Sequence, residues 1–310
     1  MNRLSVVATL LALWLVPCQA AQAEVSLEQT ERGVTVKLDG QPFTEYLIKS
    51  GSKPVLWPVY GPTGKRMTRN WPMENDVPGE TDRDHVHQRS FWFTHGDVNG
   101  VDFWAPGKGR IEHREFVKVE EDPVATIVTR NDWVSPDGSE VVCQDERTLR
   151  FGGDAEQRWI DFDIVLKATN GPVVFGDTKE GSFGIRTASS MRVDSKPGGK
   201  IVNSNGQEDK QAWGKPAAWV DYHGPIDGET LGIAILNHPT SFRFPTHWHV
   251  RTYGLFAANP VGLSDFTGGA SRGEYTLPAG ETLSLRYRVL LHKGDEKSAG
   301  VAEAFSKYAE

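Results

Sequence analysis

Two short histidine-containing runs are the residues best suited to chemistry in this 310-residue chain. One five-residue pattern, with histidine first and third and arginine fifth, occurs twice, at residues 85–89 and 247–251. In an extended chain alternate side chains share a face, so each run would present two imidazoles and one guanidinium together. If the runs meet in space, we expect a cluster able to hold a metal ion, transfer protons, or bind an anionic or polyhydroxylated ligand.

The first run lies in a segment, residues 82–104, that is dense in both ionisable and aromatic side chains. A surface loop does not need so many aromatic residues, and a core strand would not carry so many charges. Such a mixture is typical of a polar cavity walled by apolar side chains. The alternative is a hydrogen-bonded corner that holds two sheets together.

The second run lies in a predicted strand that continues to Tyr253. Its polar face would carry His247, His249, Arg251 and Tyr253. Its other face would carry Trp248, Val250 and Thr252. Because a solvent-facing strand usually carries Lys, Glu, Thr or Ser, the imidazoles, guanidinium and phenol predict a lined cleft instead.

A third candidate is Glu180, in the segment Asp177-Thr178-Lys179-Glu180-Gly181. A glutamate next to glycine could act as a general base where the backbone approaches a ligand. A single glutamate in a turn is more often solvated, so this signal is weaker than the histidines.

Three interpretations of the histidines remain, and acid–base chemistry with substrate binding ranks first. In it, His87 and His249 are catalytic and Glu180 is their partner base. The substrate-binding residues would be His85, Arg89, His95, His247, Arg251, Trp92 and Tyr253. No cofactor is then expected.

The second interpretation is a metal-dependent enzyme. Its divalent metal ion would be held by His85, His87, His247 and His249. The nearby arginines would lower the affinity for a cation unless carboxylates offset them. In the third interpretation the histidines are buried, neutral and structural. A non-catalytic glycan-binding module, dependent on its tryptophans, is a further alternative.

Composition narrows the partner classes. The chain has 41 acidic and 34 basic residues and a formal net charge of −7, which does not favour nucleic acid or an anionic membrane. Its ten tryptophans suit a small-molecule or oligosaccharide ligand, because indoles often stack on sugar rings. The sequence has no Gly-x-Ser-x-Gly, His-Glu-x-x-His, phosphate-loop or Gly-x-Gly-x-x-Gly motif.

Residues 1–23 resemble a signal peptide. Asn2-Arg3 precedes an apolar run of about 13 residues, shorter than the ~20 needed to span a bilayer, and Ala21-Gln22-Ala23 offers a cleavage site. We therefore expect a periplasmic or secreted protein with no membrane association after cleavage. Cys143 would then be the one remaining cysteine, most simply a buried apolar residue.

The rest of the chain predicts an all-β fold. Alternating apolar residues recur at 34–38, 125–133, 141–151, 160–168, 231–236 and 283–291, separated by turn signals such as Asp39-Gly40 and Asn170-Gly171. Residues 24–294 are expected to form one large antiparallel β-sandwich. Residues 295–310 show helical spacing and should form a short helix packed on it, with Asp295 as its cap.

The residues of the predicted site resemble a family of exported bacterial proteins of unknown function labelled "methane oxygenase PmoA". The resembling stretches are 84–90, 92–104, 177–181, 237–239, 246–251 and 259–260. The label implies a membrane oxygenase, an activity that the lack of a spanning segment after the signal argues against. The family's frequent association with carbohydrate genes implies a saccharide role.

The pattern is also similar at fold level to galactose-mutarotase-like sandwiches, in which two histidines and a glutamate act on a sugar. That resemblance favours a supersandwich and an epimerase, lyase or hydrolase acting on a sugar or an oxidised sugar derivative.

Overall fold

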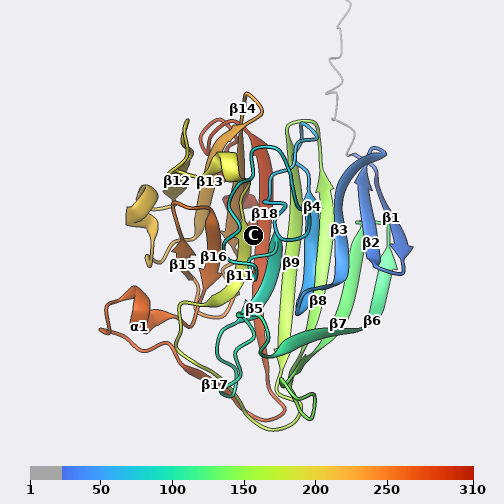
Figure 1. Cartoon of the computed structure of the whole chain (residues 1–310), viewed down its shortest axis with the longest axis vertical. Helices are drawn as coiled ribbons and strands as arrows, with labels where there is room; N and C mark the ends of the chain where they lie inside the picture. The colour runs from blue at the N-terminus through green and yellow to red at the C-terminus, as the bar shows by residue number, and fades with distance from the viewer. Residues whose placement is uncertain (1–22) are drawn as a thin grey trace, which may run out of the picture.

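The computed structural model describes residues 23–310, so residues 1–22 of the predicted signal peptide lie outside the described residues. Two eight-stranded sheets dominate the fold (Figure 1). The first sheet has the spatial order β1 (Val25–Thr30), β2 (Gly33–Leu38), β3 (Gln41–Ser50), β4 (Lys53–Val59), β5 (Phe91–His95), β11 (Gly181–Arg186), β16 (Leu255–Asn259) and β15 (His247–Val250).

The second sheet has the order β12 (Lys200–Asn203), β13 (Trp219–Ile226), β14 (Glu229–Asn237), β18 (Thr282–Lys293), β9 (Gln157–Lys167), β8 (Val141–Gly153), β7 (Thr126–Val134) and β6 (Arg110–Glu120). A ribbon of β10 (Val173–Phe175) and β17 (Tyr275–Leu277) completes the strands among residues 23–310. All of these pairings are antiparallel, which confirms the predicted class.

The strands form where the sequence alternates, and the two sheets bury their apolar faces against each other. The Asp39-Gly40 turn has positive φ at both residues (51° and 72°), as a two-residue hairpin requires. Between the sheets, Phe183 stacks on Tyr287 with ring centroids 4.5 Å apart. Cys143 is fully buried in the same core, as predicted.

The C-terminal helix α2 (Val301–Tyr308) packs on the outer face of the second sheet, through Val301 and Tyr308 against Ala234, Leu236 and Leu290. It is shorter than predicted because Asp295 closes a separate turn by accepting a hydrogen bond from Ser298 N at 2.8 Å. Short helical turns lie at η1 (Ser189–Met191), η2 (Asp209–Ala212) and α1 (Leu263–Phe266). None of the helices within residues 23–310 is long and apolar enough to cross a membrane.

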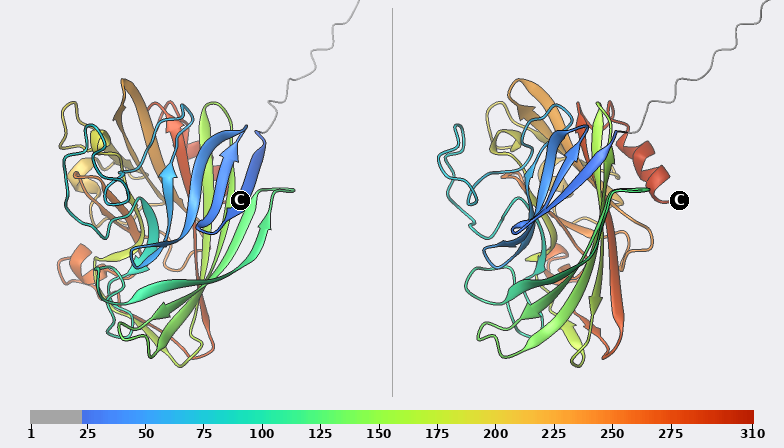
Figure 2. Two further views of the ribbon diagram at one scale, coloured as in Figure 1. Left: turned by 45° about the vertical axis from the view of Figure 1, so that its right-hand side comes forward. Right: turned by 90° about the vertical axis from the view of Figure 1, so that its right-hand side faces the viewer.

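Long loops cover the first sheet on the side that faces away from the second. Figure 2 shows the β4–β5 loop, residues 60–90, standing out on this side, with α2 on the opposite side of the molecule. We call this side the loop-covered face. Both histidine runs lie on it.

Candidate functional site

The floor of the loop-covered face is a row of paired residues that crosses five strands. Register alignment places Val55, Trp92, Gly184, Ala257 and His249 side by side in that order. The Trp92 indole lies over Gly184, where a Cβ would come 2.7 Å from the ring atom Cζ2. The small residues Gly184 and Ala257, in the row beside Trp92, therefore leave space for its indole ring.

Gly184→Ala should displace the Trp92 ring, because the added methyl would overlap it. We expect a loss of about 1–3 kcal/mol in the free energy of unfolding, together with a changed tryptophan emission. Urea unfolding with fluorescence detection measures both. Adding Trp92→Phe to Gly184→Ala removes the overlapping ring and should recover part of the stability; unchanged stability in the single variant would contradict this packing.

The second histidine run forms the edge strand β15, largely as predicted. His247 and His249 share the loop-covered face, while Trp248 and Val250 are buried on the core side. The strand ends at Val250, because the Gly254 amide bonds the carbonyl of Arg251 and closes a turn. Arg251 and Tyr253 therefore lie in a hairpin turn at the end of the strand.

The first run is not a strand, which corrects the prediction of an extended segment. His85 has φ of 46°, in the left-handed region that histidine visits uncommonly, and the Gln88 amide bonds the His85 carbonyl. The rings of His85 and His87 still lie close together, with centroids 5.6 Å apart, whereas the Arg89 guanidinium extends to Ser50.

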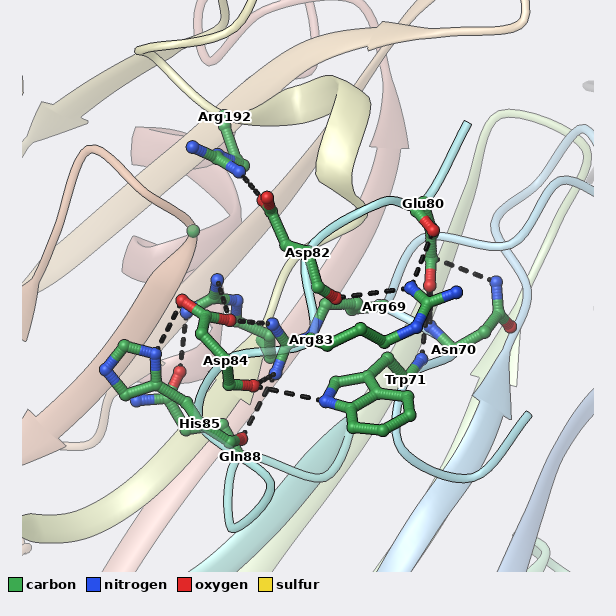
Figure 3. Close-up of polar contacts among 12 residues, drawn as sticks. Arg69, Asn70, Trp71, Glu80, Asp82, Arg83, Asp84, His85, Gln88 and Arg192 are labelled. Atoms are coloured by element: carbon green, nitrogen blue, oxygen red, sulfur yellow. Dashed lines mark hydrogen bonds and ion pairs between the residues drawn. The ribbon is translucent and has the colours of Figure 1, made fainter. Parts of the chain in front are cut away.

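Arg69 and Asp84 hold this loop in place (Figure 3). The buried Arg69 guanidinium donates to Asp84 Oδ1 at 2.6 Å and to the backbone carbonyls of Asp84 and His85 at 3.2 Å each. Asp84 Oδ2 lies 2.7 Å from His85 Nδ1, which fixes the imidazole. Burial opposes ionisation of Asp84, but the hydrogen bond from Arg69 and the charge of Arg186 outweigh it and lower its pKa.

A second set of contacts ties the rest of the loop down. The Glu80 carboxylate accepts hydrogen bonds from the backbone amides of Asn70 and Trp71, and Asp82 pairs with Arg192 (Figure 3). On the sheet, Arg186 donates to Gln88 Oε1 at 2.6 Å. The histidine-bearing end of the loop is thus fixed to β11.

The two runs converge through aromatic and cationic contacts. His85 stacks on Tyr253 with ring centroids 5.3 Å apart. The Arg251 guanidinium lies 5.7 Å from the Tyr253 ring centroid and 5.9 Å from that of Trp213. The Trp213 ring in turn contacts His249, at 6.3 Å between centroids. Segments some 160 positions apart in the chain therefore share one surface.

The four histidines do not gather as metal ligands. Within residues 23–310, the one group of three or more potential ligand atoms within 4.8 Å is Asp221, His223 and Glu296, on the second sheet. Asp221 already accepts hydrogen bonds from His223 Nδ1 at 2.6 Å and His292 Nε2 at 2.7 Å. The Asp221 carboxylate is therefore already paired within this cluster, and its strand, β13, belongs to the other sheet from β15.

Glu180 lies at the start of β11, on the rim of the loop-covered face. Its backbone carbonyl accepts a hydrogen bond from Gly96, and its carboxylate lies 3.7 Å from Lys179 Nζ. Burial raises the pKa of Glu180, while the positive charges of Lys179 and His85 oppose the rise. The carboxyl group is thus close enough to His85 for their charges to interact.

His87 and His249 are both held neutral at physiological pH. Burial, with the Lys53 charge beside it, lowers the pKa of His87 to about 4. Burial and the charge of Arg251 lower the pKa of His249 to about 4 as well. His249 is only 3% exposed, and its Nδ1 has no hydrogen-bond partner among residues 23–310. Both rings can accept a proton.

Lys53 is a candidate functional residue that the sequence analysis missed. It begins β4, is 1% exposed, and its Nζ lies 5.7 Å from the Trp92 ring centroid. Burial and the Arg89 charge lower the pKa of Lys53 to about 7. Every second side chain of a strand shares a face, so Lys53, Val55 and Trp57 are expected on the same side of β4. This spacing was the one sequence signal that could have placed Lys53 there.

The other predicted substrate-binding residues are distributed as follows. His247 is half-buried, stacks on Phe266 and has its pKa lowered by burial. Arg89 reaches away from His85 and donates to Ser50 Oγ at 3.0 Å. His95 lies on the core side instead, where its Nε2 is 2.8 Å from the Gly176 carbonyl. The structure therefore does not bring His95 to the loop-covered face.

Comparisons with known proteins give a family and a set of distant folds. Residues 33–306 match the "Family of unknown function (DUF6807)". No curated protein matches the chain. Among solved structures, "Polysaccharide Lyase BACCELL_00875" is 13% identical with a TM-score of 0.33, over 90% of this chain and 34% of that one.

Two further structures are similar at the same level. A Glycoside Hydrolase Family 97 enzyme from Pseudoalteromonas sp. strain K8, in complex with acarbose, is 8% identical with a TM-score of 0.32, over 87% of this chain and 35% of that one. The Slr1438 protein from Synechocystis sp. PCC 6803 is 10% identical with a TM-score of 0.35, over 92% of this chain and 100% of that one. The chain spans about a third of the length of the lyase and the hydrolase.

Proposed function

The chain belongs to DUF6807, a family of unknown function, and we propose that it acts on a sugar or an oxidised sugar derivative by acid–base chemistry on the loop-covered face. In this proposal His87 is the general base and Glu180 its acid–base partner. His85, Arg251 and Tyr253 contact the ligand, and His249 lies beneath it.

The convergence of the two histidine runs on Tyr253 and Arg251 carries this proposal. It places ionisable groups and flat aromatic rings on one surface, the combination that a saccharide needs for proton transfer and for stacking. Buried donors on this face are also left unpaired: within residues 23–310, the indole N–H groups of Trp92, Trp104 and Trp213 have no hydrogen-bond partner. A polyhydroxylated ligand supplies acceptors of the kind that these donors lack.

The two pKa shifts support these roles. A neutral His87 imidazole can take a proton from the sugar carbon next to a carbonyl or carboxylate group, leaving the electron pair on the oxygen of that group. A Glu180 whose pKa is raised can hold a proton and return it, either to the opposite face of that carbon or to a departing oxygen. Return to carbon is an epimerisation, and loss of the neighbouring oxygen is an elimination.

Deuterium exchange tests the proposal whichever product the reaction forms. The purified protein is incubated in deuterated water with panels of neutral sugars, keto sugars and uronic acids, and proton NMR follows each carbon-bound hydrogen. We expect one hydrogen next to a carbonyl or carboxylate group to exchange, or a new double bond to form. Exchange should stop in His87→Gln.

Binding of a sugar with no exchange and no product across the panels would contradict the acid–base proposal. That outcome favours a glycan-binding module that depends on its tryptophans, and Tyr253→Ala and Trp213→Ala would then weaken binding. Repeating the assay after dialysis against a chelator tests whether the reaction depends on a metal ion. The proposal expects deuterium exchange to be unchanged by this treatment.

A further inference from the structure

A hollow of about 430 Å³ lies beside His87 and is lined by cations without any carboxylate. Its charged lining residues are Lys49, Lys53, Arg89, Lys108 and Arg110, and His87 forms part of its wall. The whole chain has a net charge of −7, so a hollow with this lining is unlike the rest of the molecule. Its volume is in the range of small-ligand sites.

Lys53 is the most unusual member of this lining. Its side chain is 1% exposed, yet within residues 23–310 no carboxylate oxygen lies within 4 Å of its Nζ. The acidic group that raises its pKa is Asp102, whose Oδ1 already accepts hydrogen bonds from Trp104 N at 2.8 Å and Ala105 N at 3.0 Å. Buried ammonium groups are normally paired, so Lys53 is a cation without its counter-charge.

Of the neighbouring cations, Arg89 is held by a neutral group, whereas Arg110 is also paired with a carboxylate. Arg89 donates to Ser50 Oγ, and Arg110 donates to the Ser135 carbonyl at 3.1 Å and to Glu112, which lies outside the hollow's lining. Arg89 also lines a second hollow of about 450 Å³, which includes Trp57. Lys49 also lines both hollows, and the lining of the second one includes the Glu31 carboxylate.

We propose that this hollow is a carboxylate-binding subsite, and that the substrate is a sugar acid whose carboxylate pairs with Lys53 and Arg89 next to His87. The inference rests on the proposed function and names its substrate class. Pairing by these two cations would neutralise the carboxylate and stabilise the negative charge that forms on it when His87 removes the proton from the adjacent carbon. One proton passes from carbon to His87 and a second is supplied by protonated Glu180, so no electrons enter or leave and no oxidant is needed.

Calorimetric titration with matched sugars tests the subsite. Glucuronate and galacturonate are compared with glucose and galactose, using the natural protein, Lys53→Gln, and the exposed control Lys297→Gln. We expect the uronates to bind at least ~10-fold more tightly than their neutral parents. Lys53→Gln should remove most of that preference and change the affinity for neutral sugars less than about twofold, while Lys297→Gln should behave like the natural protein.

Two outcomes overturn the subsite: equal affinity for a uronate and its neutral parent, or a preference that survives Lys53→Gln. Tighter binding of glucose 6-phosphate than of glucuronate overturns the carboxylate assignment. The effect of acetate on the Tm tests carboxylate binding in the hollow independently of any reaction on a sugar. If acetate raises the Tm of the natural protein but not of Lys53→Gln at constant ionic strength, and no sugar binds, the subsite holds and the proposed function fails. If neutral sugars are processed without any uronate preference, the proposed function holds and the subsite fails.

Discussion

Lys53→Met should make the protein more stable at neutral pH by several kcal/mol. Burial lowers the pKa of Lys53 from 10.5 to about 7, which corresponds to at most about 5 kcal/mol of destabilisation of the protonated folded state. Methionine has a similar length, carries no charge, and can pack against Trp92 where the lysine stem now lies. A single substitution rarely stabilises a protein by so much.

The pH dependence identifies the cause. Between about pH 7 and pH 10.5, the unfolded chain keeps a proton on Lys53 that the folded chain has lost, so the stability of the natural protein rises with pH across this window. The advantage of Lys53→Met should be constant below about pH 7 and shrink towards zero near pH 10.5. Urea unfolding at several pH values measures it.

Lys297→Met, at an exposed position, provides the matched control and should change stability little at any pH. A Lys53→Met variant that is less stable than the natural protein at pH 7 would contradict the assignment, because it would mean that the ammonium has a strong partner. Together with lost uronate affinity, the expected gain would show a residue kept for binding at the expense of stability.

The all-β class was predictable because it depends on local patterns that the chain follows closely. In β9 and β18, apolar residues occupy every second position, at 160, 162, 164 and 166 and at 283, 285, 287, 289 and 291, which is the spacing of one buried strand face. The Asp39-Gly40 hairpin was predictable for the same reason, since both residues tolerate positive φ. The helix was predicted too long because the sequence does not distinguish the Asp295 turn from a helical cap.

The site was predictable in part. The second run follows strand periodicity, so the shared face of His247 and His249 could be read from the sequence. The first run has similar spacing, but the hydrogen bonds from Arg69 to Asp84 and to two backbone carbonyls fold it into a turn. These contacts span about 15 positions, and no period of two or of 3.6 encodes them.

His95 and Lys53 show which placements strand periodicity predicts and which depend on the tertiary fold. Strand periodicity places Trp92 and His95 on opposite faces of β5, which argues against the sequence analysis assigning both to one binding surface. The basic hollow beyond Lys53 is different. Its cations come from the β3–β4 hairpin, the first histidine run and the start of β6, which are up to 61 positions apart, and only the tertiary fold brings them together.

His87→Ala should lower the turnover of a sugar acid by about 10²–10⁴-fold, the usual contribution of a general base. The substitution removes the imidazole from the lining of the hollow but leaves Lys53 and Arg89 in place. KM should therefore change much less than kcat. Steady-state kinetics measures both values. His238→Ala removes a buried histidine near α2 and should leave turnover per folded molecule unchanged.

The pH profile distinguishes a base from a residue that only supports the fold. Because the pKa of His87 is about 4, its basic form is present above that pH, and kcat/KM of the natural protein should rise through about pH 4. Lys53 must be charged to hold the carboxylate, so kcat/KM should fall again above about pH 7. Lys53→Gln should remove the alkaline fall but keep the acid rise, whereas His87→Ala should lose the acid rise. An unchanged profile in His87→Ala would mean that another group takes the proton.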